Sequence, residues 1–114
     1  MRYPNKVKLI KLKSSRRYQQ LLSEDRGSFG VKSGHIVLKK GENIGEHTTD
    51  KQEEVIIILK GKGQAKIGND RILNIGRGKV LYIPPYTFHD IINTGSGILE
   101  YIFIISLAKR FMQK

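Results

Sequence analysis

The sequence predicts an all-β fold, a sandwich or barrel built from short strands. From residue 31 onward, short apolar runs alternate with turns that contain Gly, Asn and Pro, and this regular spacing is typical of packed antiparallel sheets. The composition agrees, because the 114 residues include 16 isoleucines, and β-branched side chains suit a pleated, buried surface. The length and the absence of internal repeats predict one domain.

The leading part of the chain precedes this regular pattern. Residues 6–13 alternate between apolar residues and lysines with a period near two, which predicts a strand with Val7 and Leu9 on one face. Residues 14–30 are polar around a patch at residues 18–22. We expect a loop or a short helical turn there.

Further strands are predicted between residues 31 and 106. Each is a short run of β-branched or aromatic residues bounded by a turn. The runs are residues 35–38, 55–59, 65–67, 71–75, 80–83, 91–92 and 99–105. Gly68 and Asn69 tolerate positive φ, so they predict a hairpin turn. Residues 107–114 are expected to be a C-terminal tail or a short helix.

Two of these runs, residues 55–59 and 101–105, are apolar on both alternating faces. The outer face of a strand in a monomeric barrel is usually polar and solvated. Because both faces of these runs are apolar, we expect another segment or subunit to pack on their outer face as a cover. The cover is either the basic residues 1–30 or another subunit. We therefore predict a barrel over residues 31–106, on which residues 1–30 or a partner subunit pack, and a homodimer.

The composition excludes several classes of protein. The chain has no cysteine, which excludes disulfide scaffolds, iron–sulfur clusters and thiol catalysis. The aliphatic runs are too short to span a bilayer, and no apolar segment follows the first charges, so we expect a cytoplasmic protein without membrane contact. No Gly-rich loop precedes a helix, which argues against Rossmann or P-loop nucleotide binding.

The net charge of +11 raises nucleic acid as a partner. Residues 1–20 hold seven basic residues and no acid, so the rest of the chain carries only the remaining +4. The sequence shows neither a stacking aromatic platform nor a recognition helix. Nucleic-acid binding through the basic leading segment is therefore the least expected function.

Two stretches gather residues that suit metal chemistry. His47 lies just before a predicted strand that Glu54 begins, and His89 follows two prolines and leads into another strand. Residues at strand ends project into the mouth of a barrel when their parity faces inward. Two imidazoles and a carboxylate that converge there form a facial set for a divalent transition metal, with positions left open for substrate or oxygen.

The same two stretches resemble the paired signatures of the cupin superfamily, G-x5-H-x-H-x4-E-x6-G and G-x5-P-x-G-x2-H-x3-N. The matching residues are Gly41, His47, Glu54 and Gly61 in the first signature and Gly78, Pro84, His89 and Asn93 in the second. The resemblance covers residues 31–106 and implies a double-stranded β-helix, or jelly-roll barrel, with a site inside it. It also implies a dimer, which is common among cupins of this size, and a metal (Fe, Mn, Ni or Zn) held by His47, Glu54 and His89.

The chain departs from the first signature at Thr49, which stands where that motif has its second histidine. A threonine hydroxyl is a poor ligand for a transition metal. Three alternatives follow: the metal is held by the other residues and water, Thr49 bonds a water or a substrate group in a metal-free site, or Gln52 or Glu53 supplies an oxygen. The second signature departs at Tyr86, which replaces Gly in a loop.

The resemblance implies a small-molecule-binding cupin. With a metal it would be an enzyme of oxygenase, isomerase or decarboxylase type that acts on a small anionic substrate. Thr49, Tyr82 and Tyr101 are the candidate ligand contacts. The alternative is a non-catalytic binding or sensing cupin without a metal, since one fold supports many functions.

Overall fold

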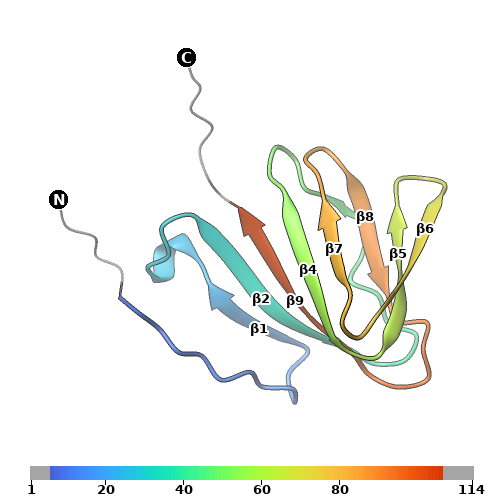
Figure 1. Cartoon of the computed structure of the whole chain (residues 1–114), viewed down its shortest axis with the longest axis horizontal. Helices are drawn as coiled ribbons and strands as arrows, with labels where there is room; N and C mark the ends of the chain where they lie inside the picture. The colour runs from blue at the N-terminus through green and yellow to red at the C-terminus, as the bar shows by residue number, and fades with distance from the viewer. Residues whose placement is uncertain (1–5, 107–114) are drawn as a thin grey trace.

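The structure is a computed structural model that describes residues 6–106. Nine strands and one short 3-10 helix follow one another along this part of the chain (Figure 1). Their bounds are β1 Tyr18–Leu22, η1 Glu24–Arg26, β2 Val31–Leu38, β3 His47–Thr48, β4 Glu54–Lys60, β5 Lys62–Ile67, β6 Arg71–Gly76, β7 Val80–Ile83, β8 Phe88–Ile92 and β9 Leu99–Ser106.

The strands form two antiparallel sheets. The five-stranded sheet has the order β1-β2-β9-β4-β7, and the four-stranded sheet has the order β3-β8-β5-β6. Strands far apart in the sequence are neighbours, such as β2 with β9 and β5 with β8 (Figure 1). This wrapping of one chain into two facing sheets confirms the predicted double-stranded β-helix, or jelly-roll barrel.

The hydrophobic core lies between the two sheets. Along β4, Ile56 and Ile58 are 1% and 2% exposed, whereas Val55 and Ile57 on the other face are half-buried. Burial of each such side chain stabilises the fold by about 1.5–3 kcal/mol. The buried core consists of Ile36, Leu38, Ile56, Ile58, Ala65, Ile75, Ile83, Ile91, Leu99 and Tyr101.

The leading segment contacts the outer face of the five-stranded sheet at Gln19 of β1, which bonds the backbone of Lys11 and Lys13, and at Glu100 of β9. The Ser14 hydroxyl donates a hydrogen bond of 2.7 Å to the carboxylate of Glu100, which points outward from β9. These contacts lie outside residues 55–59 and 101–105, so the cover expected over those two runs stays a prediction. The homodimer stays a prediction.

The strand predicted over residues 6–13 is wrong, because β1 is the first strand of the described residues. Val7 and Leu9 are fully exposed, and an alternating pattern makes a strand only where a sheet edge is available to pair with it. The loop or turn predicted for residues 14–30 is correct only in part, since this stretch contains β1 as well as η1.

The other predicted strands are present as β2 and as β4 to β9, and β5 and β6 form the predicted hairpin with Gly68 at φ 61°. Strand β3 has two residues, too few to produce a pattern in the sequence. The tail or helix predicted for residues 107–114 lies outside the described residues. Among residues 6–106, no helix is long and apolar enough to cross a membrane.

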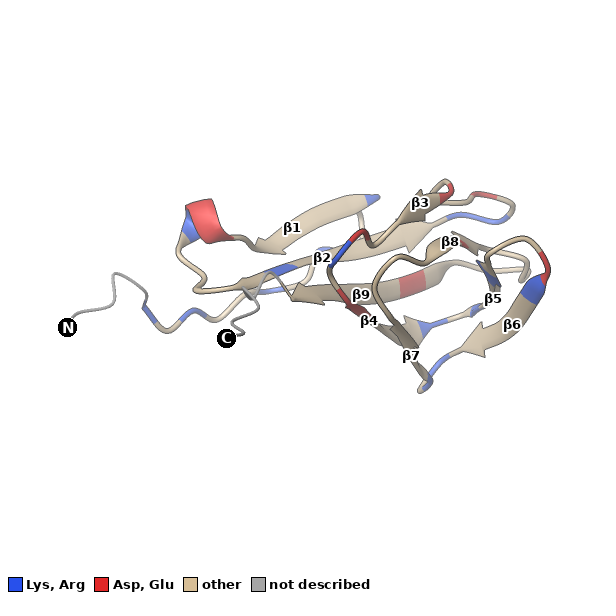
Figure 2. Cartoon of the chain, turned by 90° about the horizontal axis from the view of Figure 1, so that it is seen from above, with Lys and Arg blue, Asp and Glu red and all other residues tan. Residues whose placement is uncertain are grey.

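The positive charge is densest along the leading segment, where residues 6–17 hold six Lys and Arg residues and no acid. In Figure 2, Lys and Arg occur along the leading segment and again on several strands and turns. One of these residues, Arg17, is already paired with Glu42 at 3.0 Å. Nucleic-acid binding through this segment stays the least expected function and is a prediction only.

Candidate metal centre

Three strands bring the predicted metal-binding residues together. His47 begins β3 and is the direct cross-strand partner of His89 on β8, so both rings project from the same face of the four-stranded sheet. Glu54 begins β4 in the opposite sheet and points inward with Ile56 and Ile58. One potential ligand atom from each of the three side chains lies within 4.8 Å of the others.

Two of the three residues in the cluster are buried, and the third is exposed. His89 and Glu54 are 1% and 5% exposed, whereas His47 is exposed. The rings of His47 and His89 meet edge to face, with their centroids 4.1 Å apart. A group bound here would therefore have protein on one side and access to solvent or ligand on the other.

The Nε2 atom of His89 is buried and has no hydrogen-bond partner among the described residues. It lies 3.0 Å from Oε1 of Glu54, but the two groups are not aligned as donor and acceptor. Buried polar atoms are rarely left in this state unless a water or an ion completes them. The geometry thus fits a cation placed between the imidazole and the carboxylate.

Backbone carbonyls fix the orientation of both rings. Nδ1 of His47 lies 2.9 Å from the Gly45 carbonyl, and Nδ1 of His89 lies 3.1 Å from the Thr87 carbonyl. A carbonyl only accepts, so each Nδ1 carries the proton and donates it. Each Nε2 is then left to present its lone pair, which is the usual arrangement of metal-ligating histidines.

The protonation of His89 reflects this environment. Burial of the ring opposes the charged form, but the Glu54 carboxylate, the Thr87 carbonyl and the nearby Asp90 favour it. On balance these groups raise the pKa of His89 above its ordinary value of 6.5. A proton and a metal ion therefore compete for this imidazole, because a ligating histidine must be neutral.

Asp90 positions the segment that carries His47. Its carboxylate accepts hydrogen bonds from the Gly45 backbone N–H at 2.9 Å and from Nδ2 of Asn43 at 2.8 Å. The carbonyl of the same Gly45 then accepts from His47. Asp90, which follows His89 in the sequence, is therefore linked to His47 through the backbone of Gly45.

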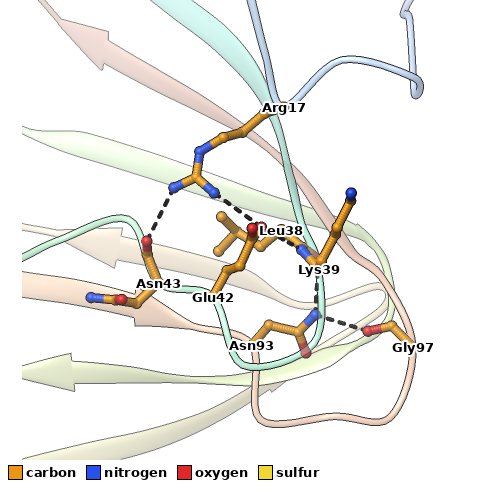
Figure 3. Close-up of polar contacts among 7 residues, drawn as sticks. All are labelled: Arg17, Leu38, Lys39, Glu42, Asn43, Asn93 and Gly97. Carbon is orange, nitrogen blue, oxygen red and sulfur yellow. Dashed lines mark hydrogen bonds and ion pairs between the residues drawn. The ribbon is translucent and has the colours of Figure 1, made fainter.

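The turn that leads into this segment is fixed from both ends (Figure 3). Arg17 donates to the carboxylate of Glu42 at 3.0 Å and to the carbonyl of Asn43 at 3.2 Å. On the side of the turn opposite Arg17, Nδ2 of Asn93 donates to the carbonyls of Leu38 and Gly97. The last residue of the second signature, Asn93, thus acts as a backbone clamp and not as a ligand.

A cavity of about 490 Å³ adjoins the cluster. Of the three predicted ligand contacts, Tyr101 lines it and is 2% exposed. Burial raises the pKa of Tyr101 well above its ordinary value, and the charges of Glu54 and Asp90 add to this effect against an opposing one from Arg17. Tyr101 is therefore a neutral phenol at the wall of the cavity.

The structure does not bring Thr49 and Tyr82 together with the cluster. Tyr82 pairs with Val55 on the outward parity of β4, is 54% exposed and donates to Glu53 at 2.7 Å. The Thr49 hydroxyl donates to the Pro84 carbonyl at 2.8 Å and accepts from the Thr87 N–H. Thr49 ties two loops together, and Glu53 faces away from the site.

Sequence reasoning missed the supporting residues. Spacing and periodicity in the sequence do not indicate that Asp90 supports the segment before His47 or that Arg17 fixes the turn. The sequence carried one indication, because Asp90 directly follows a predicted ligand. Its contacts depend on the path of the turn before β3, which periodicity does not reveal.

The donor set suits a transition metal or zinc better than calcium or magnesium. Two imidazole nitrogens and one carboxylate oxygen are the ligands that these ions share, and they leave open coordination positions. Within residues 6–106, this is the group of histidines and acids that is close enough to hold an ion.

Comparison with known proteins identifies the family and the fold of this chain. The sequence model of the cupin domain matches residues 34–105. A predicted oxalate decarboxylase from Thermotoga maritima is 28% identical, with a TM-score of 0.72 over 80% of this chain and 79% of that chain.

Two further solved structures share the fold. An RmlC-like cupin from Methanocaldococcus jannaschii is 24% identical, with a TM-score of 0.76 over 89% of this chain and 91% of that one. A Cupin 2 conserved barrel domain protein from Salinispora arenicola is 18% identical, with a TM-score of 0.74 and 89% coverage of both chains. No curated protein matches the sequence.

Proposed function

The chain belongs to the cupin domain family, and we propose that it binds a divalent transition metal through His47, Glu54 and His89. The metal and the adjoining cavity together form the site for a small anionic molecule. The observation that carries this proposal is the convergence of one potential ligand atom from each of these three side chains within 4.8 Å, with Nε2 of His89 buried and 3.0 Å from a Glu54 oxygen.

When bound, such a metal supplies Lewis-acid or redox chemistry of the oxygenase, isomerase or decarboxylase type. The similarity to a predicted oxalate decarboxylase favours the decarboxylase type and a carboxylate substrate. Tyr101 is available as a neutral hydrogen-bond donor to that substrate, because its raised pKa keeps the phenol protonated.

We further propose that Thr49 replaces a ligand histidine without binding the metal. Its hydroxyl already donates to Pro84 and accepts from Thr87, so little capacity remains for an ion. The metal would then have three protein ligands, with its other positions available to water and to the substrate.

A metal-free ligand-binding cupin is the second candidate function, and the same Thr49 favours it. Loss of one histidine lowers the affinity for any metal, and the raised pKa of His89 makes a proton the competitor. In that case His89 and Glu54 would form an ion pair that binds the polar group of a ligand directly.

Metal titration of the stripped protein separates the two candidates. We expect one equivalent of Mn(II), Fe(II), Ni(II) or Zn(II) to bind in isothermal titration, and we expect His89→Ala to abolish this binding. His35→Ala is the matched control, because His35 is equally buried and also pairs with a glutamate. Absence of uptake by the wild-type protein, or unchanged affinity in His89→Ala, defeats the metal proposal.

A further inference from the structure

The floor of the cavity is the inner face of the five-stranded sheet, and its residues follow from the strand register. Ile105 on β9 is the direct partner of Lys32 on one side and of Glu54 on the other. Direct cross-strand partners project from the same face. A row that runs from a lysine through an isoleucine to the proposed metal ligand, and on to Ile83 of β7, therefore crosses the floor.

The next row is apolar and contains a glycine for steric reasons. Gly34 is the partner of Phe103, which in turn pairs with Ile56. A Cβ atom on Gly34 would lie 2.6 Å from the ring of Phe103 and 2.7 Å from the ring of Tyr18. Without that Cβ the two rings lie over the glycine, stacked with 6.4 Å between their centroids.

The opposite wall is also apolar. Ile44 and Ile91 line the cavity there, in addition to Tyr18, Ile36, Phe103 and Ile105 on the floor. The polar part of the lining consists of His47, Glu54 and His89 together with the charged residues Arg17, Lys32 and Glu46. The volume of about 490 Å³ falls within the range of about 300–1,000 Å³ that is usual for sites of drug-sized ligands.

We infer that the ligand is a carboxylic acid with an apolar body, such as an aromatic or branched 2-oxo acid. Its acid group would lie at the metal end, which is the part of this inference that rests on the proposed function. Its apolar body would contact Ile105, Phe103 and Tyr18. The exposed side chain of Lys32 makes no ion pair or hydrogen bond with the described residues. Its ammonium group adds a positive charge at the rim of the cavity, which attracts an anion.

Oxalate fits this cavity poorly. It has no apolar surface, so it would leave the isoleucine and aromatic side chains without a partner while it gave up its own hydration. In pockets of this kind, apolar contacts supply most of the affinity and a few polar groups fix the orientation. A small dianion makes no such apolar contacts, so most of the cavity volume adds nothing to its affinity.

Binding of phenylpyruvate and of oxalate tests the inference. In isothermal titration of Mn(II)-loaded protein, we expect phenylpyruvate to bind at least about tenfold more tightly than oxalate. The same pair is titrated into the stripped protein. Oxalate binding as tightly as phenylpyruvate, or more tightly, in the loaded protein overturns the inference.

The matched variants are Ile105→Ala and Ile104→Ala, which alter neighbouring residues of β9 on opposite faces of the sheet. Ile104 pairs with Val55 on the outer face. We expect Ile105→Ala to weaken phenylpyruvate binding about tenfold through lost apolar contact, with oxalate binding unchanged. Ile104→Ala should leave both affinities unchanged, and thermal unfolding checks that both variants fold.

The two proposals fail in different ways. Lack of metal uptake defeats the metal site alone, and the apolar preference is then tested on the stripped protein by the same variants. Equal effects of Ile105→Ala and Ile104→Ala on phenylpyruvate binding, or no phenylpyruvate binding in either form, overturn the inferred ligand class even if the metal binds.

Discussion

A buried histidine pairs with a glutamate of the five-stranded sheet on each face of that sheet. On the inner face, Nε2 of His89 lies 3.0 Å from Glu54, and on the outer face, Nε2 of His35 lies 2.7 Å from Glu100. The histidines are 1% and 0% exposed, so burial does not distinguish the two pairs. Their surroundings do.

The outer pair is closed by a structural contact, whereas the inner pair faces a third ligand and a cavity. Glu100 accepts from the Ser14 hydroxyl as well as from His35. Nδ1 of His35 also lacks a partner, but within the described residues the outer face does not add a third histidine or acid to this pair. A buried pair becomes a candidate site only when a further ligand and space for a ligand adjoin it.

Replacing each glutamate in turn is expected to give the largest difference between the pairs. Glu54→Gln removes the anionic ligand, so the affinity for Mn(II) should fall by at least about 100-fold, beyond the usual effect of losing an outer-shell contact. Glu100→Gln should leave that affinity unchanged. Equal losses in both variants would mean that the comparison between the two faces is wrong.

A substitution of Asp90 tests whether the residues that support the inner cluster affect metal binding. Asp90→Ala removes the acceptor for Gly45, whose carbonyl orients His47, and we expect metal affinity to fall by about 10-fold to 100-fold. Asp70→Ala, in the exposed β5–β6 turn, is the control. If Asp90 had only a structural role, the variant would lower the melting temperature while the wild-type affinity for Mn(II) remained.

For the outer pair, His35 and Glu100, we expect a smaller effect, a loss of stability at acidic pH. Burial raises the pKa of Glu100, but the hydrogen bonds from Ser14 and His35 and the charges of His35 and Lys60 lower it below its ordinary value of 4.5. A depressed pKa contributes stability that is present above the unfolded pKa and is lost as the pH falls through the folded one.

Thermal unfolding between about pH 3 and pH 6 measures this contribution. As the pH falls below 4.5, the melting temperature of the wild-type protein should fall more steeply than that of Glu100→Gln, which has no carboxylate to protonate. Parallel curves for the two proteins would show that the outer pair adds no pH-dependent stability.

The sequence predicted the fold and the cluster well because both depend on local patterns. Strand parity places Glu54 inward with Ile56 and Ile58, and the turns fall where glycine allows positive φ, as at Gly61 and Gly78. The spacing of the two signatures therefore anticipated the three residues that lie together.

The remaining features depend on tertiary contacts that no local pattern encodes. The alternation in residues 6–13 predicted a strand that has no sheet edge to join, and Tyr82 was assigned to the site although its parity places it outside. Asp90 gains its role only because the turn before β3 passes beside it. Lys32 reaches the cavity through its register with β9.

The most direct test of the metal centre is a crystal structure of the protein soaked with Mn(II), with the element identified by anomalous scattering. The account predicts a single peak bonded to Nε2 of His47, Nε2 of His89 and the carboxylate of Glu54, at about 2.0–2.3 Å from each. A peak elsewhere on the molecule, or no peak at this position at saturating metal, would contradict it.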